Sequence, residues 1–270
     1  MEEISDKASE TYWSGVWEHS ALNPAIDVNS GSLRQYPQRA LHKMFKSAFQ
    51  KLDTGGMKLI EIGCGNSAWL PYFKKEYGFD VFGIDYSEKG CMQAKKILER
   101  ENVSGTIIKA DAFSPGQDLI GEFDVVCSFG VIEHFDDTAK TLSAFSKYLK
   151  SGGLIITTIP NMCGVNGWLH KVMNRELYDI HVPIDKKQLA KAVGKSGLSS
   201  VNCGYYVGVS LNVQLNGTTQ PVRHLKLKQF LSKAGAAITL LFWWIEESIG
   251  AFPQSKLFSR GVFSIAKKKG

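Results

Sequence analysis

The chain has 270 residues, of which 44% are hydrophobic and 21% are charged, and its formal net charge is +6. These values lie near the averages of globular proteins and exclude a disordered, collagen-like or disulfide-scaffold protein. The length predicts one large domain or two small ones. Residues 186–270 hold 13 Lys and Arg but only two acids, which favours either an anionic partner for this part or a solvated lysine surface.

The predicted elements alternate between strand and helix through the middle of the chain. Residues 1–52 lie outside this alternation and contain Tyr12, Trp13, Trp17 and a predicted helix at Pro37–Leu52. From Met57 onward, short apolar or β-branched runs predict strands, and the longer mixed segments between them predict helices. The strands are expected at Lys58–Ile62, Asp80–Ile84, Gly105–Lys109, Asp124–Ser128 and Leu154–Ile159, and the helices at Ala68–Tyr77, Glu88–Glu101 and Thr138–Leu149. This alternation indicates βαβ units and a parallel sheet.

After Pro160 the alternation is looser, with a helix expected at Asp185–Ser196 and strands at Val201–Val209 and Gly261–Ala266. A basic and then strongly apolar helix is expected at Val222–Ile249. Its part Gly235–Ile245 is apolar on all sides, which predicts burial. We therefore expect four regions: an N-terminal helical cap (1–52), a ligand-binding core (53–209), a helical insertion (210–256) and a final core strand with a basic tail (257–270).

The five cysteines are odd in number and form no C-x-x-C pair, so neither a disulfide framework nor a four-cysteine zinc site is expected. The first ten residues are acidic and polar, which argues against a signal or transit peptide. The longest uncharged apolar run, Ala234 to Ile245, is shorter than the roughly 18 residues that a membrane span needs. We expect a cytoplasmic protein, with a peripheral contact at a membrane as a further option.

The first chemical motif is the sequence from Glu61 to Ser67, in which a strand runs into a glycine loop that opens a helix. Glycine lets the backbone turn sharply and approach a ligand closely, and the helix N-terminus offers free N–H groups to an anion. The spacing Gly63-x-Gly65-x-x-Ala68 also fits the dinucleotide fingerprint. A nicotinamide-dependent oxidoreductase is therefore one alternative, and a tight turn without a ligand is another.

Three further motifs follow later strands. Asp85 ends the second strand 20 residues after Gly65, where a ribose-binding carboxylate belongs, whereas Ser87 is the better helix cap. Asp111 follows the third strand and could accept from an exocyclic amine, while Phe113 could lie against a purine or pack in the core. The loop from Ser128 to Phe135 follows the fourth strand, and ligands of open α/β sheets bind at such carboxyl ends.

The order and spacing of these motifs resemble the class I S-adenosylmethionine (SAM)-dependent methyltransferases. The resemblance covers Met57 to Ile159, where E-x-G-x-G, an acid ending strand two, D-A, F-D-x-V, V-I-E-H-F and L-K-S-G-G-x-L occur in the family's order. It looks closest to the small-molecule group that includes the ubiquinone-pathway O-methyltransferases, in which a block like Ile180–Pro183 precedes a helix. It implies an α/β fold, a Rossmann-like doubly wound sheet of seven strands whose last strand, Gly261–Ala266, is antiparallel.

The resemblance also implies a SAM site and its residues. The methionine end would meet Glu61 and the glycine loop, the ribose Asp85, the adenine Asp111 and Ala112, and the sulfonium side the backbone of Phe129. The full expected set is Glu61, Gly63, Cys64, Gly65, Asp85, Tyr86, Asp111, Ala112, Phe113 and Phe129. The family's usual third glycine is Ser67 here, and Tyr12 and Trp13 could close over the cofactor or simply pack.

The predicted reaction moves a methyl group from SAM to an oxygen, or a nitrogen, of a small, partly hydrophobic acceptor and leaves S-adenosylhomocysteine. An oxygen acceptor must lose a proton, and histidine is the usual base near neutral pH. His134 and His181 are the candidate catalytic residues, and a scaffold role is the alternative for each. No metal site is predicted, because Asp136 and Asp137 fit a helix N-cap better.

Two readings of the C-terminal half remain open. The helix at Val222–Ile249 could be a lid over the acceptor, a homodimer contact, a membrane-surface contact or a core helix of a cap domain. The basic residues that precede its apolar part would suit anionic lipid headgroups. The chain could alternatively be a non-catalytic SAM-binding protein whose basic region binds a membrane or nucleic acid. Methylation of nucleic acid is not favoured, because the loop after strand four lacks an N-P-P-Y type signature.

Overall fold

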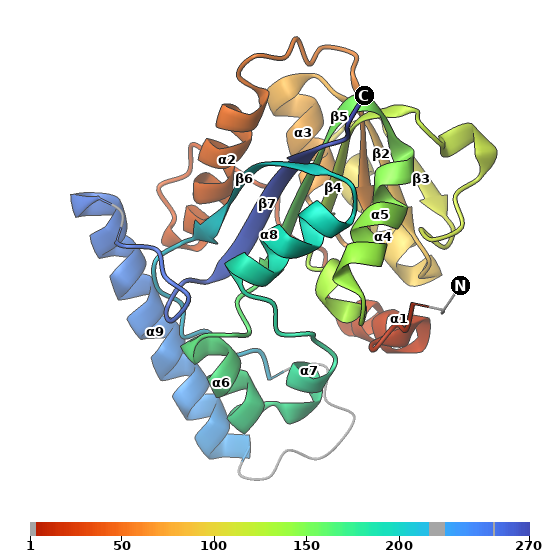
Figure 1. The fold of residues 1–270 in the computed structure, drawn as a ribbon. Coiled ribbons are helices and arrows are strands. Elements are labelled where there is room, and N and C mark those ends of the chain that lie inside the picture. Colours follow the sequence, from red (N-terminus) through yellow and green to blue (C-terminus); the bar gives the residue numbers. More distant parts are fainter. Residues whose placement is uncertain (1–3, 216–224, 251) are drawn as a thin grey trace.

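The computed structural model describes residues 4–215, 225–250 and 252–270. A single twisted sheet forms its centre, and helices cover both faces (Figure 1). The sheet order is β3-β2-β1-β4-β5-β7-β6. Its strands are β1 Lys58–Ile62, β2 Asp80–Asp85, β3 Thr106–Lys109, β4 Phe123–Phe129, β5 Leu149–Pro160, β6 Ser199–Tyr206 and β7 Gly261–Lys267. Only β7 runs antiparallel to its neighbours, which confirms the predicted Rossmann-like fold.

The strand order places a switch point beside β1. Leu59 of β1 pairs with Val81 of β2 on one side and with Val125 of β4 on the other, both in parallel register. The connection after β1 leads to β2 on one side, whereas the connection after β3 crosses to β4 on the other side, so a crevice opens at the carboxyl ends of the strands. The glycine loop and the loop after β4 both lie at this edge.

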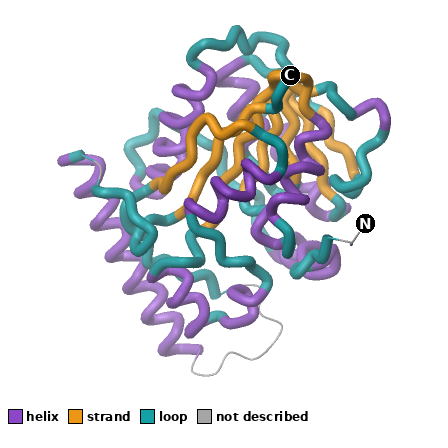
Figure 2. The backbone as a smooth tube through the Cα atoms, viewed as in Figure 1, coloured by secondary structure: helices purple, strands orange, loops and turns teal. Residues whose placement is uncertain are grey.

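The central strands are apolar on both faces because each face is covered by helices. Ile60 of β1 packs with Leu142 and Leu189 in one cluster, under helices α5 (Thr138–Phe145) and α8 (Lys186–Lys195). Leu59, the neighbouring residue of β1, packs with Phe45 in the opposite cluster. That cluster lies under α2 (Tyr36–Phe49), α3 (Trp69–Tyr77) and α4 (Glu88–Arg100). Figure 2 shows the strands enclosed between the two groups of helices.

The main differences from the predicted elements have local causes. The helix expected to reach Leu149 ends at Phe145 and continues as a short 3-10 turn, because Leu149 already pairs with Phe123 at the start of β5. The strand expected at Val201–Val209 ends at Tyr206, since Val207 has a left-handed φ of 58°. Three helices were not predicted: α1 Ser9–His19, α6 Val165–Met173 and α7 Arg175–Asp179.

Helix α9 (Leu225–Ile249) lies outside the sheet (Figure 1), and its Lys228 donates to the carbonyl of Met173 at the end of α6 at 2.9 Å. Residues 222–224 of the predicted helix lie outside the described part of the chain. One face is buried through Thr239, Trp243 and Glu246, and the opposite face is exposed, so the expected burial of the apolar part occurs within the described chain on one face. No helix in the described part of the chain combines the length and apolarity that a membrane crossing needs.

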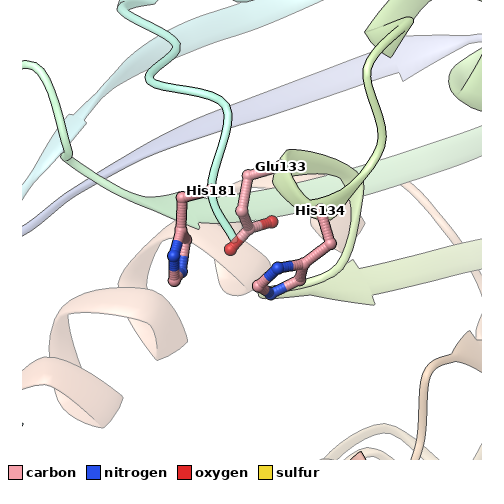
Figure 3. Close-up of side chains that lie close together, drawn as sticks. All are labelled: Glu133, His134 and His181. Carbon is pink, nitrogen blue, oxygen red and sulfur yellow. The ribbon is translucent and has the colours of Figure 1, made fainter. Parts of the chain in front are cut away.

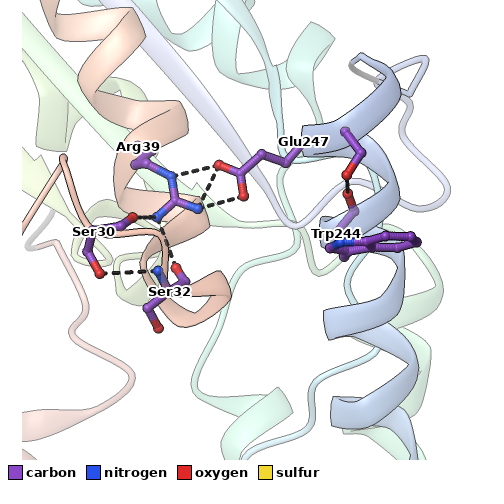
Figure 4. A network of polar contacts seen from close by, with 6 residues as sticks. Ser30, Ser32, Arg39, Trp244 and Glu247 are labelled. Carbon is purple, nitrogen blue, oxygen red and sulfur yellow. Dashed lines mark hydrogen bonds and ion pairs between the residues drawn. The ribbon is translucent and has the colours of Figure 1, made fainter.

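Polar contacts dock α9 onto the core. The indole Nε1 of Trp243 donates to the carbonyl of Val209 at 2.8 Å. The carboxylate of Glu247 forms an ion pair with Arg39 of α2 at 2.7 Å (Figure 4). Arg39 also donates to the carbonyl of Ser32 at 2.9 Å, which ties the segment before α2 to the same guanidinium. The buried face of α9 is therefore fixed by specific bonds and not by apolar packing alone.

Candidate functional site

A cavity of about 320 Å³ lies at the carboxyl ends of β1, β2 and β4. Eight of the ten residues expected to bind SAM line it: Gly63, Gly65, Asp85, Tyr86, Asp111, Ala112, Phe113 and Phe129. A second cavity of about 290 Å³ adjoins it and is lined by Glu61 and Ser67. The two cavities share Trp17, Gly63, Gly65 and Phe129. They form one groove that passes over the glycine loop.

The glycine loop depends on the absence of side chains at two positions. Gly63 has a φ of 74°, and a Cβ there would lie 2.5 Å from a methyl group of Val131. A Cβ on Gly65 would lie 2.8 Å from the indole nitrogen of Trp17 and 2.9 Å from a carboxylate oxygen of Asp85. Real Cβ atoms do not approach so closely, so either substitution would displace the groove wall.

Asp85 holds the glycine loop while facing the larger cavity. Its Oδ2 accepts from the backbone N–H of Gly65 and its Oδ1 from that of Ser87, each at 2.8 Å. Burial raises the pKa of the Asp85 carboxyl, and the two N–H donors partly offset that effect. A carboxylate offers about four lone-pair sites, so two accepted bonds leave acceptor capacity for ribose hydroxyls. Ser87 caps α4 by accepting from Gly90, as the sequence predicts.

Glu61 and Ser67 form a buried pair at the other end of the groove. The Ser67 hydroxyl lies 2.7 Å and 2.8 Å from the two carboxyl oxygens of Glu61. Burial raises the pKa of Glu61 to about 8, although the Ser67 hydroxyl acts in the opposite direction. The residue in place of the usual third glycine thus holds the acid of the motif. The Cys64 side chain instead points away from the groove, against Gly83 in the core.

The opposite end of the groove is aromatic and acidic. The Oδ1 of Asp111 accepts from the backbone N–H of Phe113 at 2.9 Å. The Phe113 ring packs edge-on against Phe135, with centroids 4.7 Å apart, and also lines the cavity. The packing and the ligand-facing interpretations of Phe113 are therefore compatible. Tyr86 donates its hydroxyl to Asp6 at 3.0 Å, so its ring is held at the cavity wall.

The N-terminal segment covers the groove, and the sequence showed this only in part. Trp13 and Trp17 of α1 stack with centroids 5.4 Å apart, and both line the larger cavity. The backbone of Lys7 donates to the carbonyl of His134 at 2.9 Å, which attaches this segment to the loop after β4. Asp6 was not singled out from the sequence. The spacing of Trp13 and Trp17, one helical turn apart, was the available signal.

The two candidate histidines meet in a third cavity of about 280 Å³. The rings of His134 and His181 have centroids 4.6 Å apart (Figure 3). Burial lowers the pKa of both, and that of His181 falls to about 3, with His134 as the second cause. Both rings are therefore neutral at physiological pH. A base with a pKa near 3 is weak, however, because efficient proton acceptors have pKa values near the working pH.

The third cavity adjoins the groove. Trp13, Gly130 and His134 line both spaces. The other walls of the third cavity combine apolar Ile159, Met162 and Leu177 with polar Asn212, Gln214 and Arg260. A small molecule in this cavity would face a ligand in the groove across that shared wall.

A family model described as a methyltransferase domain matches residues 31–202. The chain belongs to this methyltransferase family. It is 27% identical over 195 residues to a ubiquinone biosynthesis O-methyltransferase of Thiobacillus denitrificans, covering 68% of this chain and 78% of that protein. A namesake from Cereibacter sphaeroides is 27% identical over 193 residues, covering 68% and 77%.

Solved structures show the same fold at lower identity. A SAM-dependent methyltransferase from Archaeoglobus fulgidus gives a TM-score of 0.53 at 19% identity, covering 85% of this chain and 94% of that one. Phosphoethanolamine N-methyltransferase 2 of Haemonchus contortus gives 0.59 at 16% identity, covering 97% and 58%.

The methyltransferase uses SAM as its methyl donor, and the groove fits that cofactor. An acid with spare acceptor capacity lies at the expected ribose position, and an acid lies at the end expected for the amino-acid tail. The glycine loop between them leaves the backbone open to close approach. Family membership removes the nicotinamide-dependent oxidoreductase alternative, whose fingerprint the same glycines fit.

Proposed function

We propose that this methyltransferase transfers the methyl group of SAM to an oxygen of a small, partly hydrophobic molecule, with nitrogen as the alternative acceptor atom. The observation that supports the proposal is the acceptor-sized cavity that shares Trp13, Gly130 and His134 with the cofactor groove. A wall common to both spaces allows the reacting atoms to approach directly, and alignment alone can contribute up to about 7–11 kcal/mol to such a reaction.

In this proposal, SAM lies along the groove in one orientation. Glu61 faces the ammonium of the methionine tail and Asp85 the ribose hydroxyls. Asp111 and Ala112 border the adenine, with Phe113 against its ring, and Tyr86 closes the wall. Gly63 and Gly65, with the backbone of Cys64, carry the cofactor past the bend, and Phe129 borders the sulfonium. The methyl group then points toward the loop of Gly130 and His134.

The transfer is an in-line displacement. A lone pair of the acceptor oxygen forms a bond to the methyl carbon, the carbon–sulfur bond breaks, and its electron pair stays on sulfur. Charge is neutralised as the bond forms, so a site without bulk water favours the reaction. The proton of the acceptor must also leave. His134 and His181 are the residues that we propose contact the acceptor at this step.

The acceptor cavity also indicates what the acceptor carries. Arg260 lines it, with its guanidinium 5.8 Å from the ring centroid of Trp243, and it forms no ion pair with a carboxylate in the described part of the chain. A half-buried cation of this kind favours an acceptor with an anionic group beside its apolar body. The relatives named ubiquinone biosynthesis O-methyltransferase favour oxygen as the methylated atom.

The test combines SAM binding with methyl transfer. Calorimetry should detect SAM binding to the wild type, and Asp85→Ala should weaken it by at least about tenfold because both the ribose contact and the loop are lost. Asp118→Ala, at an exposed aspartate, is the matched control. Labelled SAM should then methylate phenols or alcohols that carry an acid group. SAM binding without transfer to any oxygen or nitrogen acceptor would favour the non-catalytic alternative, and absence of SAM binding would refute the proposal.

We further propose that the exposed face of α9 contacts a membrane surface or a second copy of the chain. Its large exposed apolar side chains are Leu225, Leu227, Phe230, Leu231, Ile238, Leu241, Trp244 and Ile249. Lys226 and Lys233 of the same helix suit anionic lipid headgroups, whereas Lys228 donates to the carbonyl of Met173 at 2.9 Å. Sedimentation with anionic vesicles, and the molar mass in solution without them, separate the two occupants. A protein that is monomeric in solution and does not sediment with anionic vesicles would contradict both the membrane contact and the dimer contact.

A further inference from the structure

Three potential metal ligands come together between the loop after β4 and the segment after α7. Glu133, His134 and His181 each place one candidate ligand atom within 4.8 Å of the other two. Figure 3 shows the Glu133 carboxylate between the two imidazole rings. The three residues are 1%, 4% and 7% exposed, so the cluster is not a chance gathering of surface side chains.

The backbone fixes the tautomer of both histidines. The Nδ1 of His134 lies 2.9 Å from the carbonyl oxygen of Ile180, and the Nδ1 of His181 lies 2.6 Å from that of Leu177. A carbonyl only accepts, so each Nδ1 carries the hydrogen. Each Nε2 is left with a lone pair, which is the arrangement found in metal-binding histidines whose second nitrogen donates to a carbonyl.

The third histidine of the acceptor cavity shows the contrast. His170 places its Nδ1 2.8 Å from the carbonyl oxygen of Asn166, and its Nε2 accepts from the backbone of Gln214 at 3.3 Å. Both of its nitrogens are used within the protein. No hydrogen bond to the Nε2 of His134 or His181 is found within the described residues, although the nearby backbone of Gly130 acts to raise the pKa of His134.

Glu133 supplies an independent observation that points to a ligand. Neither oxygen of its buried carboxyl group has a hydrogen-bond partner in the described part of the chain. Its backbone carbonyl accepts from Val182 at 2.7 Å, which joins its loop to the segment of His181. A buried carboxyl with no partner is costly unless a cation or a hydrogen-bond donor completes it.

We propose that Glu133, His134 and His181 bind one divalent transition-metal ion of the zinc class, at the acceptor side of the site. Two imidazoles and one carboxylate suit Zn²⁺, Fe²⁺ or Co²⁺ better than the all-oxygen preference of Mg²⁺. Ligand distances of about 2.0–2.2 Å hold ligands roughly 3–4 Å apart, so closure on an ion needs small side-chain adjustments. This departs from the sequence, which predicts no metal site.

Three protein ligands leave at least one position open, as in catalytic zinc sites. The ligands line the acceptor cavity, and His134 also borders the cofactor groove. The open position would therefore take an oxygen of the acceptor, whose acidity the ion would increase. This inference rests on the proposed function for the identity of that oxygen, and it assigns His134 and His181 a role as ligands in place of a general base.

The test is metal binding by the full chain, measured apart from activity. Protein stripped with a chelator is titrated with Zn²⁺ in competition with a chromophoric chelator, and with Co²⁺ while visible absorption is followed. We expect one tightly bound ion and intense Co²⁺ bands typical of low-coordinate nitrogen and oxygen ligation. Glu133→Gln and His181→Gln should each weaken Zn²⁺ binding by at least about tenfold, the range seen when a ligand shell is damaged.

His19→Gln and Glu99→Gln, at exposed positions of the same residue types, are the matched controls. SAM binding by every variant reports folding. Where a variant no longer binds SAM, its weaker metal binding could reflect misfolding, and the Co²⁺ spectrum of the wild type then decides whether the metal site exists. No wild-type uptake of Zn²⁺ or Co²⁺, or uptake that Glu133→Gln and His181→Gln leave unchanged, would overturn the inference. SAM binding without metal binding refutes the metal site alone, whereas absence of SAM binding refutes the proposed function.

Discussion

We expect the Glu61–Ser67 pair to make SAM binding dependent on pH, because Glu61 is the residue proposed to face the ammonium group of SAM. Burial raises the pKa of the Glu61 carboxyl to about 8 in the ligand-free protein, so roughly nine in ten molecules carry the proton at pH 7. An ammonium group facing Glu61 requires the carboxylate. SAM binding should therefore release a proton, and the proton competes with the cofactor below pH 8.

The expected size follows from the pKa. Relative to a fully ionised Glu61, SAM affinity should be about tenfold lower at pH 7 and about a hundredfold lower at pH 6. The α-amino group of SAM loses its own proton above about pH 8, so affinity should peak near that pH. At pH 7 the net release should be about 0.8 proton, after a small uptake by the amine.

Calorimetry in two buffers of different ionisation enthalpy measures that release directly. Glu61→Gln should release no proton, should bind SAM with a flat profile from pH 6 to 8, and should bind it more weakly than the wild type at pH 8. Glu99→Gln, at an exposed position, is the control and should behave as the wild type. Wild-type binding at pH 7 with no proton release would refute either the ammonium contact or the protonation of Glu61.

Three other predictions concern the groove and the core. Gly65→Ala should weaken SAM binding by at least about tenfold because its Cβ would meet Trp17 and Asp85. Gly194→Ala, whose Cβ would meet nothing within 4 Å, should bind SAM normally, and its free energy of unfolding in denaturant should rise by about 0.5–1 kcal/mol. Equal SAM affinity of the two variants would contradict the described geometry of the glycine loop. Phe45→Ala, which empties a fully buried site against Phe73 and Trp69, should lower the free energy of unfolding by about 3–5 kcal/mol. A loss below 1 kcal/mol would show that α2 does not pack on α3 through these rings as described. In the ligand-free wild type, burial raises the folded-state pKa of Glu61 from 4.5 to about 8, so between these pH values the folded protein keeps a proton that the unfolded chain has lost. The free energy of unfolding of the wild type should therefore fall relative to that of Glu61→Gln as the pH rises from 5 to 8. Melting temperatures of the two proteins that change in parallel across this range would contradict this prediction.

The sheet could be predicted from the sequence because its signal is local. Leu59 and Ile60 are both apolar since each faces a different covered side of β1, and the run stands out between polar segments. The glycine loop and Asp85 follow from spacing along the chain. The direction of the Cys64 side chain does not, because a motif specifies which residue is present and not which side of the strand end it faces.

The sequence did not predict the position of segments that are held in place by residues far away in the chain. No residue of helix α1 is fully buried, and its position follows from Trp13 and Trp17 lying over a groove built by strands far along the chain. Helix α9 was expected from its apolar composition to be buried against another surface, which the sequence alone did not identify. Its actual single buried face is selected by Val209 and Gly208, which accept from Trp243 and donate to Glu246.

The contact between the two candidate histidines could not be predicted from the sequence either. His134 and His181 were each identified from the sequence, but the 46-residue separation between His134 and its carbonyl partner Ile180 gives no local sign that the rings touch. Once they touch, burial lowers the pKa of both, and the interpretation of either as a general base becomes weaker. The same contacts leave two Nε2 lone pairs and an unpartnered carboxyl at the wall between donor and acceptor. Residues that the sequence offers as separate bases are thus, in the fold, better suited to acting together on a single ligand.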